Sequence, residues 1–398
     1  MKFLIAPNAL KGSLTPIEAA ECIAAALKKN SHNDFTLCPI ADGGNGTLEC
    51  LVRATNGKFF STPVCGPVGR SSTTPYSGKK INARWGTLGN GKIENDATGD
   101  TAVIEMAEAA GLSAYGGLKP DEYDVLHATT FGVGELIIAA LDAGFRKIII
   151  GMGGSATNDG GAGCARALGA RFLAESSVGD KNGNELPDGG IHLARLTHID
   201  CRKLDERLKE CEITALSDVT NILYGPAGAT FTYARQKGAK EDELPILDDA
   251  LRHYSSILKK DLRKDVASLA GSGAAGGLGA GLAAFCNAKI VSGIDFILDT
   301  IRFDELLQHC DAVITAEGTI DEQTLFGKGI AGIAQRAEKF HKPIHAFAGR
   351  INGDTEKLKR KLHLASLHQI SPDTMPLNEA MKNARTLLEN EIKKTFTP

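Results

Sequence analysis

The stretch KIIIGMGGSATNDGGAGCARALGA, residues 147–170, decides the fold of this chain. Its three consecutive isoleucines, residues 148–150, predict a short strand that is buried on both faces. Seven glycines then occur between Gly151 and Gly169, with hydroxyl, amide and carboxylate side chains among them, before the helix-forming segment CARALG. In a strand, glycine-rich turn and helix, backbone N–H groups can hold an anion, usually a phosphate. The alternative is a tight connection that needs glycine only for its dihedrals, but the interleaved polar side chains favour a ligand site.

The length and composition indicate a two-domain cytoplasmic enzyme. A chain of 398 residues exceeds the size at which single cores stop growing. The net charge of −3 gives no electrostatic footprint for nucleic acid, and no apolar run has the length of a membrane span. Nine cysteines, an odd number without a Cys-x-x-Cys pair, predict reduced thiols rather than disulfides or a zinc site. The N-terminus lacks a signal peptide's features. We expect neither nucleic acid nor membrane as a partner, and homodimer formation is left open.

The first fifty residues place polar side chains after two predicted strands. Residues 2–6 and 35–40 are expected to be strands, and Thr15 to Glu18 marks a helix start by a capping box with proline at the first helical position. Lys11 and Ser13 follow the first strand, and Asp42 follows the second. Open α/β sheets bind ligands at the carboxyl ends of their strands. These three residues are therefore site candidates, with an exposed loop or a helix cap as the competing interpretation.

The middle of the chain differs in character from its two ends. Residues 66–100 contain many Thr, Ser, Gly and Lys residues and predict short antiparallel strands. Further along, Asp218 follows a predicted strand at 213–216. From residue 311 onward strands and helices alternate again, ending in an expected helix from Asn378 to Lys394, and Glu317 and Asp321 follow the strand at 311–315.

This order predicts an α/β fold with two α/β domains. One is a doubly wound, flavodoxin- or Rossmann-like sheet built from both chain ends, residues 1–65 and 290–398. The other is an inserted mixed α/β domain, residues 66–289, which carries the glycine-rich motifs. We expect the site in the cleft between them.

Two nucleotide-binding signatures are incomplete. No glycine–lysine pair stands in a Walker frame, so a P-loop is not expected. Gly271 to Gly276 matches G-x-G-x-x-G but follows no predicted strand, whereas Gly151 to Ala156 matches the variant ending in alanine and follows a strand in mid-chain. From motifs alone, a nicotinamide-dependent oxidoreductase is the second-best class.

A set of motifs in a fixed order carries a family resemblance. The motifs are APNALKGSL, PIADGGNGT, GMGGSATNDGGAG, SDVTN, QKGA, GSGAAGGLGAG, GIDFILD and AEGTIDEQTLFGK. The chain resembles the bacterial glycerate kinase type 1 family, D-glycerate 2-kinases, from Met1 to about Gly349. The resemblance implies two α/β domains, ATP and Mg²⁺ as cofactors, and phosphorylation of D-glycerate to 2-phosphoglycerate.

The chain departs from the family's pattern at several positions, among them Asn8, Ile222, Ala316 and Thr319. The change at Thr319 removes an arginine, and with it a positive charge near the last motif. The alternatives are therefore a kinase for another small hydroxy acid, or phosphorylation of glycerate at its 3-hydroxyl. A binding protein without activity is the third hypothesis.

The resemblance and the needs of phosphoryl transfer suggest roles for the motif residues. Because no motif contains a histidine, the base must come from the acids, and we favour Asp218, which ends a strand before Thr220 and Asn221. The expected catalytic residues are Asp218, Lys11 and Asp42. Expected substrate contacts are Ser13, Asn158, Asp159, Glu317 and Asp321. Expected ATP contacts are Gly153, Gly154, Ser155, Thr157, Gly273, Gly276 and Gly277. Expected Mg²⁺ contacts are Asp42, Glu317 and Asp321.

Overall fold

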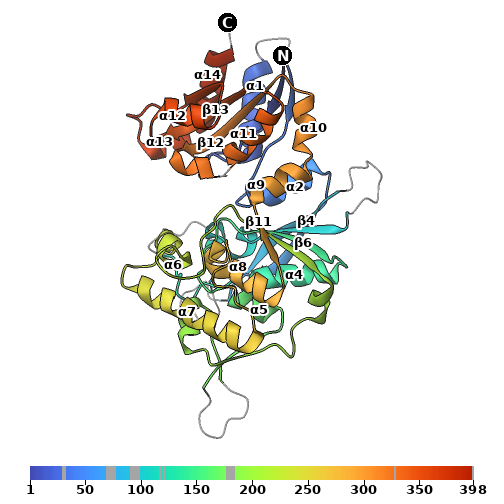
Figure 1. The fold of residues 1–398 in the computed structure, drawn as a ribbon, viewed down its shortest axis with the longest axis vertical. Coiled ribbons are helices and arrows are strands. Elements are labelled where there is room, and N and C mark those ends of the chain that lie inside the picture. Colours follow the sequence, from blue (N-terminus) through green and yellow to red (C-terminus); the bar gives the residue numbers. More distant parts are fainter. Residues whose placement is uncertain are drawn as a thin grey trace. The chain divides into compact units, whose positions relative to one another are not determined.

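The computed structural model describes residues 1–28, 33–68, 78–89, 99–115, 119, 122–175, 184–326 and 329–396. The chain divides into two units. Unit 1 comprises residues 1–42, 49–54 and 292–398, and unit 2 comprises residues 43–48 and 55–291. In Figure 1 the dark blue start and the red end of the chain belong to unit 1, and the green and yellow segments belong to unit 2, as do β4 in light blue and α8 in orange.

Unit 1 is built on a parallel sheet that, over its described residues, has the strand order β14-β13-β12-β1-β2. Its strands are β1 (Lys2–Ile5), β2 (Asp34–Leu37), β12 (Ala312–Ile320), β13 (Ile344–Ile351) and β14 (Ser366–Gln369). Its helices are α1 (Pro16–Lys28), α9 (Gly293–Thr300), α10 (Phe303–Gln308), α11 (Gly329–Lys339), α12 (Thr355–Lys361), α13 (Leu377–Lys382) and α14 (Ala384–Phe396), with the 3-10 turn η6 (Glu322–Phe326). Helix α2 (Thr47–Ala54) spans the boundary between the units.

Helices cover both faces of this sheet because its central strands alternate their buried side chains. Phe3 and Ile5 of β1 pack in one apolar cluster with α1 and α14. Leu4 and the adjoining Ala6 pack in a second cluster with α9, α10, α11 and α12. The unit is therefore doubly wound, as predicted. The capping box at the start of α1 is also confirmed, since the Thr15 N–H donates to Glu18 Oε2 at 2.9 Å.

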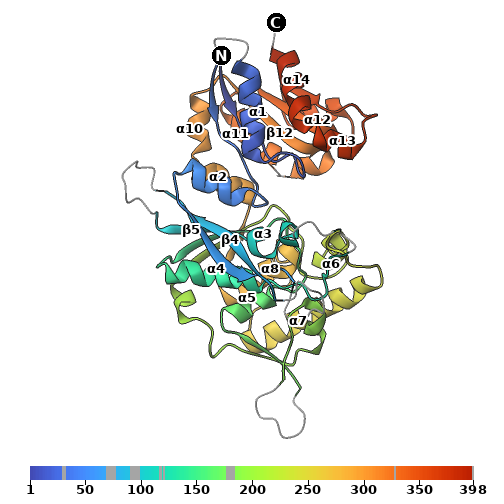
Figure 2. The same ribbon diagram turned by 180° about the vertical axis from the view of Figure 1, so that it is seen from behind.

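Unit 2 contains a mixed sheet in the order β11-β10-β6-β5-β4-β3 and a small antiparallel sheet in the order β8-β7-β9, over its described residues. Its strands are β3 (Phe59–Cys65), β4 (Lys80–Thr87), β5 (Thr101–Glu105), β6 (Lys147–Gly151), β7 (Arg171–Ala174), β8 (Asn184–Glu185), β9 (His198–Asp200), β10 (Glu212–Leu216) and β11 (Lys289–Val291). Its helices are α3 (Ala107–Ala110), α4 (Phe131–Asp142), α5 (Ala162–Ala167), α6 (Ala229–Tyr233), α7 (Glu243–Leu262) and α8 (Ala274–Phe285). Its 3-10 turns are η1 (Leu112–Tyr115), η3 (Gly190–Arg195), η4 (Glu206–Glu210) and η5 (Arg235–Lys237). Figure 2 gives the opposite view of these elements.

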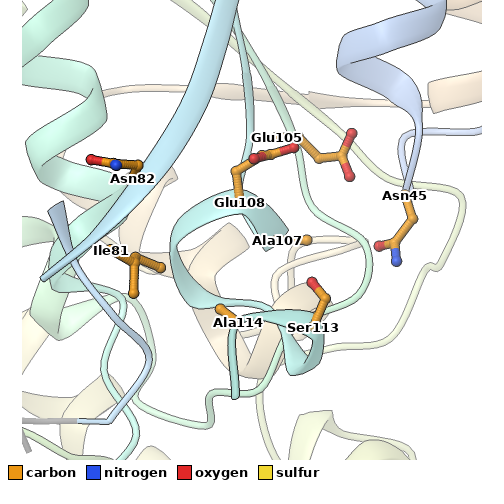
Figure 3. Close-up of a pocket in the computed structure, with 8 residues that line it drawn as sticks. All are labelled: Asn45, Ile81, Asn82, Glu105, Ala107, Glu108, Ser113 and Ala114. Atoms are coloured by element: carbon orange, nitrogen blue, oxygen red, sulfur yellow. The ribbon is translucent and has the colours of Figure 1, made fainter. Parts of the chain in front are cut away.

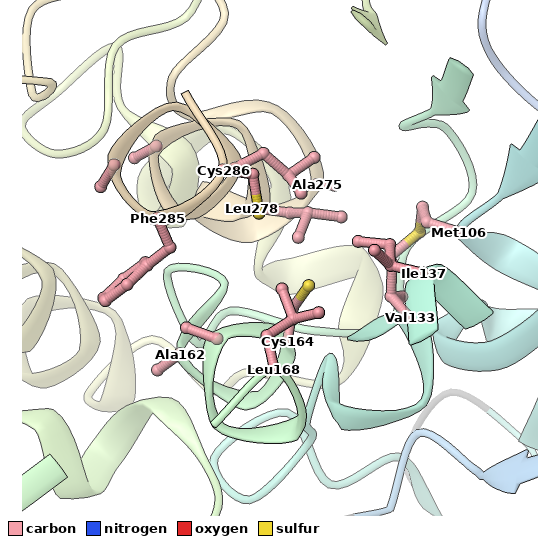
Figure 4. Close-up of a cluster of buried hydrophobic side chains, with 14 of the residues drawn as sticks. Met106, Val133, Ile137, Ala162, Cys164, Leu168, Ala275, Leu278, Phe285 and Cys286 are labelled. Atoms are coloured by element: carbon pink, nitrogen blue, oxygen red, sulfur yellow. The ribbon is translucent and has the colours of Figure 1, made fainter. Parts of the chain in front are cut away.

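The isoleucine strand β6 lies inside the larger sheet, paired in parallel with β5 on one side and β10 on the other. Ile148 and Ile150 are buried in the core of unit 2, which confirms the expected buried strand. Helices α5 and α8 contribute mostly small side chains to the same core, whereas α4 adds larger ones such as Val133 and Ile137 (Figure 4). Helix α4 approaches α5 closely at Gly134, where an added Cβ would lie 2.4 Å from the Cys164 carbonyl oxygen. Among the described residues, none of the helices combines the length and apolar character needed to cross a membrane.

Two boundaries differ from those expected. Residues 59–65 were expected in the doubly wound domain, but they form β3, which pairs antiparallel with β4 in unit 2. The closing helix expected from Asn378 to Lys394 is divided into α13 and α14, with Asn383 between them. In both cases pairing or packing with distant residues sets the boundary.

The two glycine-rich stretches of unit 2 touch each other backbone to backbone. The Gly160 N–H donates to the carbonyl oxygen of Gly276 at 3.0 Å. A Cβ on Gly276 would lie 1.9 Å from the Thr157 carbonyl oxygen, and one on Gly277 would lie 2.7 Å from Gly160 Cα. Ala275, Gly276 and Gly277 have φ values of +53°, +67° and +92°. The contact therefore requires both positive φ and the absence of side chains.

We expect Gly276→Ala to lower the free energy of unfolding by about 3 kcal/mol or more, because it adds a steric overlap with backbone to the strain of a positive φ. Gly225→Ala is the matched control: Gly225 has a φ of +97°, but no atom lies within 4 Å of an added Cβ. The control should lose only about 1–2 kcal/mol. Urea unfolding followed by circular dichroism measures both, and equal losses would show that the contact is not the constraint.

Candidate functional site

The glycine-rich turn after β6 is covered on one side by residues 43–48. A Cβ on Gly153 would lie 2.2 Å from Gly44 Cα. One on Gly154, where φ is +71°, would lie 1.9 Å from Asn45 Oδ1. The close approach that these two glycines permit in the structure is therefore to protein atoms. Their contact with a phosphate stays a prediction.

Lys237, at the end of η5, supports this turn from inside unit 2. Its side chain is 1% exposed, and its Nζ donates to Ser155 Oγ at 2.8 Å and to the Thr157 carbonyl oxygen at 2.7 Å. Burial lowers the pKa of Lys237 to about 7, against the opposing effect of the Asp159 carboxylate. The lysine therefore fixes two residues of the turn, Ser155 and Thr157, that were expected to contact ATP.

Asn158 and Asp159, expected to contact substrate, are buried beneath the turn. Asp159 Oδ2 accepts hydrogen bonds from the Thr130 N–H at 2.8 Å, the Thr130 hydroxyl at 2.9 Å and the Gly163 N–H at 3.1 Å. Burial raises the pKa of Asp159, while these hydrogen bonds oppose the rise. Asn158 Nδ2 donates to Thr230 Oγ1 at 3.0 Å. These contacts give both residues a structural role, tying the turn to the start of α4 and to α6.

Asp218 lies at the same edge of the sheet as the turn. It is half-buried two residues beyond Leu216, and Leu216 is paired with Gly151 in the parallel register of β10 and β6. The loop after β10 also touches the second glycine-rich stretch, since a Cβ on Gly271 would lie 3.3 Å from the Val219 carbonyl oxygen. The structure therefore brings Asp218 and both glycine-rich stretches together within unit 2.

The glycines expected at the nucleotide from the second stretch have packing functions of their own. A Cβ on Gly273 would lie 2.1 Å from the Ile222 carbonyl oxygen. Gly276 and Gly277 form the backbone contact with the first stretch described above. Glycine at these three positions is thus explained without a ligand, and their contact with ATP stays a prediction.

A cavity of about 270 Å³ lies beside residues 43–48 in unit 2 (Figure 3). Asn45, Glu105, Glu108 and Ser113 are among the side chains around it. The Glu105 carboxylate accepts hydrogen bonds from two backbone N–H groups at the start of α2, and burial raises its pKa to about 7. Glu108 is bonded to Arg84 at 2.7 Å. The carboxylates of Glu105 and Glu108 therefore both make contacts that stabilise unit 2.

A second cavity, of about 360 Å³, lies entirely within unit 1 at the carboxyl ends of its parallel strands. Three of the expected site residues line it: Lys11, Ser13 and Glu317. Arg350 and Ser371 also line it, together with apolar side chains of α13 and α14. Lys11 is exposed, and Ser13 Oγ donates to the Leu10 carbonyl oxygen at 2.8 Å. A cavity lined by both cationic and apolar side chains can hold a small organic anion.

The other two acids of unit 1 lie in the loops that follow strands. Asp42 Oδ2 accepts a hydrogen bond from Asn8 Nδ2 at 3.3 Å, so the departure from the family at Asn8 contacts an expected catalytic residue. Asp321 Oδ1 accepts from the Thr324 N–H at 3.2 Å and caps the turn η6. Asp321 thus has the capping role that was the competing interpretation.

Among the described residues, no group of three or more His, Cys, Asp and Glu side chains is arranged to hold a metal ion. This donor set still fits Mg²⁺, which in nucleotide-dependent enzymes keeps several waters and takes one or two carboxylates plus substrate phosphates. Asp42, Glu317 and Asp321 are the carboxylates expected in that limited role, and Asp42 Oδ2 and Asp321 Oδ1 each also accept a hydrogen bond within unit 1.

Sequence reasoning gave no role to two residues that the structure places at these sites. Lys237 was visible only as part of the QKGA motif, and Arg350 only as the residue after a predicted strand. A cation at the carboxyl end of a strand was a usable signal for Arg350. No local signal indicates that Lys237 is buried.

Lys237 should make stability depend on pH. Between about pH 7 and the unfolded value of 10.5, the unfolded lysine is protonated and the folded one is not, so stability rises with pH. We expect the unfolding free energy of the wild type, relative to Lys237→Met, to increase from pH 7 to pH 9, by at most about 1.4 kcal/mol per pH unit. Urea unfolding at each pH measures this difference.

Lys240→Met is the matched control, because Lys240 is an exposed lysine just beyond the same turn. Its stability curve should remain parallel to that of the wild type across the same range. If the stability curve of Lys237→Met is also parallel to that of the wild type, the burial of Lys237 does not lower its pKa.

Comparison with known proteins adds to this geometry. The model of the glycerate kinase family matches residues 3–397. A glycerate kinase of Bacillus subtilis is 40% identical over 99% of this chain and 96% of its own length, and a glycerate 2-kinase of Escherichia coli is 42% identical over 89% and 86%. The crystal structure of a Salmonella typhimurium protein provisionally assigned as glycerate kinase 2 has a TM-score of 0.77 and 39% identity, covering 99% of this chain and 97% of that one. The chain belongs to the glycerate kinase family.

Proposed function

We propose that this enzyme transfers the γ-phosphoryl group of ATP to the 2-hydroxyl of D-glycerate and releases 2-phosphoglycerate. The chain belongs to the glycerate kinase family. The observation that carries the proposal is the cavity of unit 1, which is lined by a lysine, a serine and a glutamate near the strand ends. Such groups suit a small hydroxy acid. The Escherichia coli relative, described as a glycerate 2-kinase, supports the 2-hydroxyl as acceptor.

The nucleotide is assigned to unit 2. Phosphoryl transfer depends mainly on positioning and on neutralising charge. The turn from Gly151 to Thr157 begins at the strand end next to Asp218, and Lys237 holds its shape. Gly273, Gly276 and Gly277 belong to the second glycine-rich stretch, which is packed beside the turn. Asn158 and Asp159 act from below by fixing the turn, because both are buried.

In unit 1, Lys11 and Ser13 are assigned to the anionic groups of glycerate or of the transferred phosphoryl group. Asp42, Glu317 and Asp321 would hold Mg²⁺. When bound, the metal ion neutralises phosphate charge.

Asp218 is assigned as the base that accepts the proton of the attacking hydroxyl. Its position at the end of β10, beside the turn, supports this role. A carboxylate can take this proton if it lies within hydrogen-bond reach of the hydroxyl.

The state of the cysteines supports a cytoplasmic location. None of the nine cysteines, all of which lie in the described ranges, forms a disulfide bond, and seven of them are buried. Disulfides persist in oxidising compartments and are rare in the cytosol.

Asp218→Asn should lower kcat by about two to four orders of magnitude while the melting temperature stays within a few degrees. The amide keeps the shape of the side chain but cannot accept the proton. Asp249→Asn is the matched control, since Asp249 is exposed on α7 of the same unit. Activity of Asp218→Asn within tenfold of the control would remove Asp218 from the chemistry.

The product identifies the reaction itself. Purified enzyme with ATP, Mg²⁺ and D-glycerate should give ADP and a single new phosphomonoester resonance whose proton coupling is that of 2-phosphoglycerate. A 3-phosphoglycerate spectrum would move the reaction to the other hydroxyl. A coupled assay with hydroxypyruvate, tartronate and lactate tests other hydroxy acids, and nucleotide binding without turnover on any of them would indicate a binding protein.

A further inference from the structure

Arg350 lines the cavity of unit 1 and has no role in the reaction proposed above. Arg350 is the penultimate residue of β13, and the parallel register pairs it with Thr319 of β12. Both residues line the cavity, together with Lys11. Two cations therefore lie at the carboxyl edge of one sheet, around a single cavity.

The hydrogen bonds of Arg350 are incomplete. Its Nη2 donates to the carbonyl oxygen of Met375, which fixes the guanidinium group. Its Nε is buried and has no acceptor in the described part of the chain. Across the same described residues, no carboxylate forms an ion pair with Arg350. A buried donor without an acceptor is costly, so a ligand atom at this point would be stabilising.

The geometry of a guanidinium group selects the ligand. Its Nε–H and a neighbouring Nη–H form a planar fork that matches the two oxygens of a carboxylate. Apolar side chains, Leu377 and Met381 among them, also line the cavity. They suit the carbon atoms of an organic acid.

We propose that Arg350 binds the carboxylate of the hydroxy-acid substrate and so makes the enzyme prefer an acid to a neutral polyol or amide. This assignment rests on the proposed function for the identity of the substrate. Lys11 then provides the second positive charge of the cavity, for the phosphoryl group or the remaining oxygens. Arg350 touches substrate in this role and sets specificity rather than moving a proton.

The test compares D-glycerate with glyceramide, its neutral amide, in direct binding by calorimetry. The wild type should bind glycerate about 10- to 100-fold more tightly than glyceramide, as expected for a charge-assisted pair. In Arg350→Gln, glycerate should weaken by a similar factor, and the preference for the acid should largely disappear. Arg350→Lys, which keeps the charge but loses the fork, should lie between the two.

Arg360→Gln is the matched control, because Arg360 is an exposed arginine on α12 of the same unit. It should keep wild-type affinity for both ligands, and melting curves of all variants check that they fold. Arg350→Gln with the control's affinity for glycerate, or with an unchanged preference for the acid, would overturn the proposal. So would a wild type that binds neither ligand.

The same variants separate this proposal from the proposed function. If the wild type phosphorylates glycerate and Arg350→Gln keeps both KM for glycerate and the acid preference, only the role of Arg350 fails. If the wild type binds glycerate through Arg350 but forms no phosphoglycerate, the site stands and the proposed reaction fails.

Discussion

The hydrogen bond from the Gly160 N–H to the Gly276 carbonyl oxygen joins two segments that lie far apart in the sequence, and the rest of unit 2 depends on it. Its length of 3.0 Å is reached only because neither segment has a side chain at the crossing. The turn after β6 and the start of α8 are thereby held together, and the small side chains of α5 and α8 can share one core. A Cβ at Gly276 would lie 1.9 Å from the Thr157 carbonyl oxygen, so the two segments could not keep this contact unchanged.

The buried side chains of Lys237 and Asp159 hold the turn after β6 in shape by their hydrogen bonds. Lys237 donates to Ser155 and Thr157, while Asp159 accepts from Thr130 and from the start of α5. Burying either charge alone is costly, and the pKa shifts of both groups show this cost. The polar residues here thus form two groups: Lys237, Asp159 and Thr130 fix the turn by hydrogen bonds inside unit 2, whereas Asp218 follows the end of β10 at the same edge of the sheet.

Local signals in the sequence predicted the helices and strands well, but they did not predict which distant residues would contact a given side chain or glycine. The isoleucine run of β6 and the capping box of α1 depend on neighbouring residues, so both were predictable. A glycine that admits a phosphate and one that admits another backbone look alike in sequence, so the contact of Gly153 with residues 43–48 was not predictable. The burial of Lys237 is also set by elements distant in the chain. The same holds for β3, whose pairing with β4 moved the boundary between the units.

The effect of the departure from the family's pattern at Thr319 depends on the residue paired with it on the neighbouring strand. Read along the chain, threonine in place of the family's arginine removes a positive charge from the last motif. Read across the sheet, Thr319 is paired with Arg350 on the neighbouring strand, and both residues line the same cavity. Neighbouring parallel strands lie about 4.8 Å apart, a distance that a long arginine side chain can easily cross. The charge at this edge therefore depends on both strands together, and a loss on one does not make the cavity neutral.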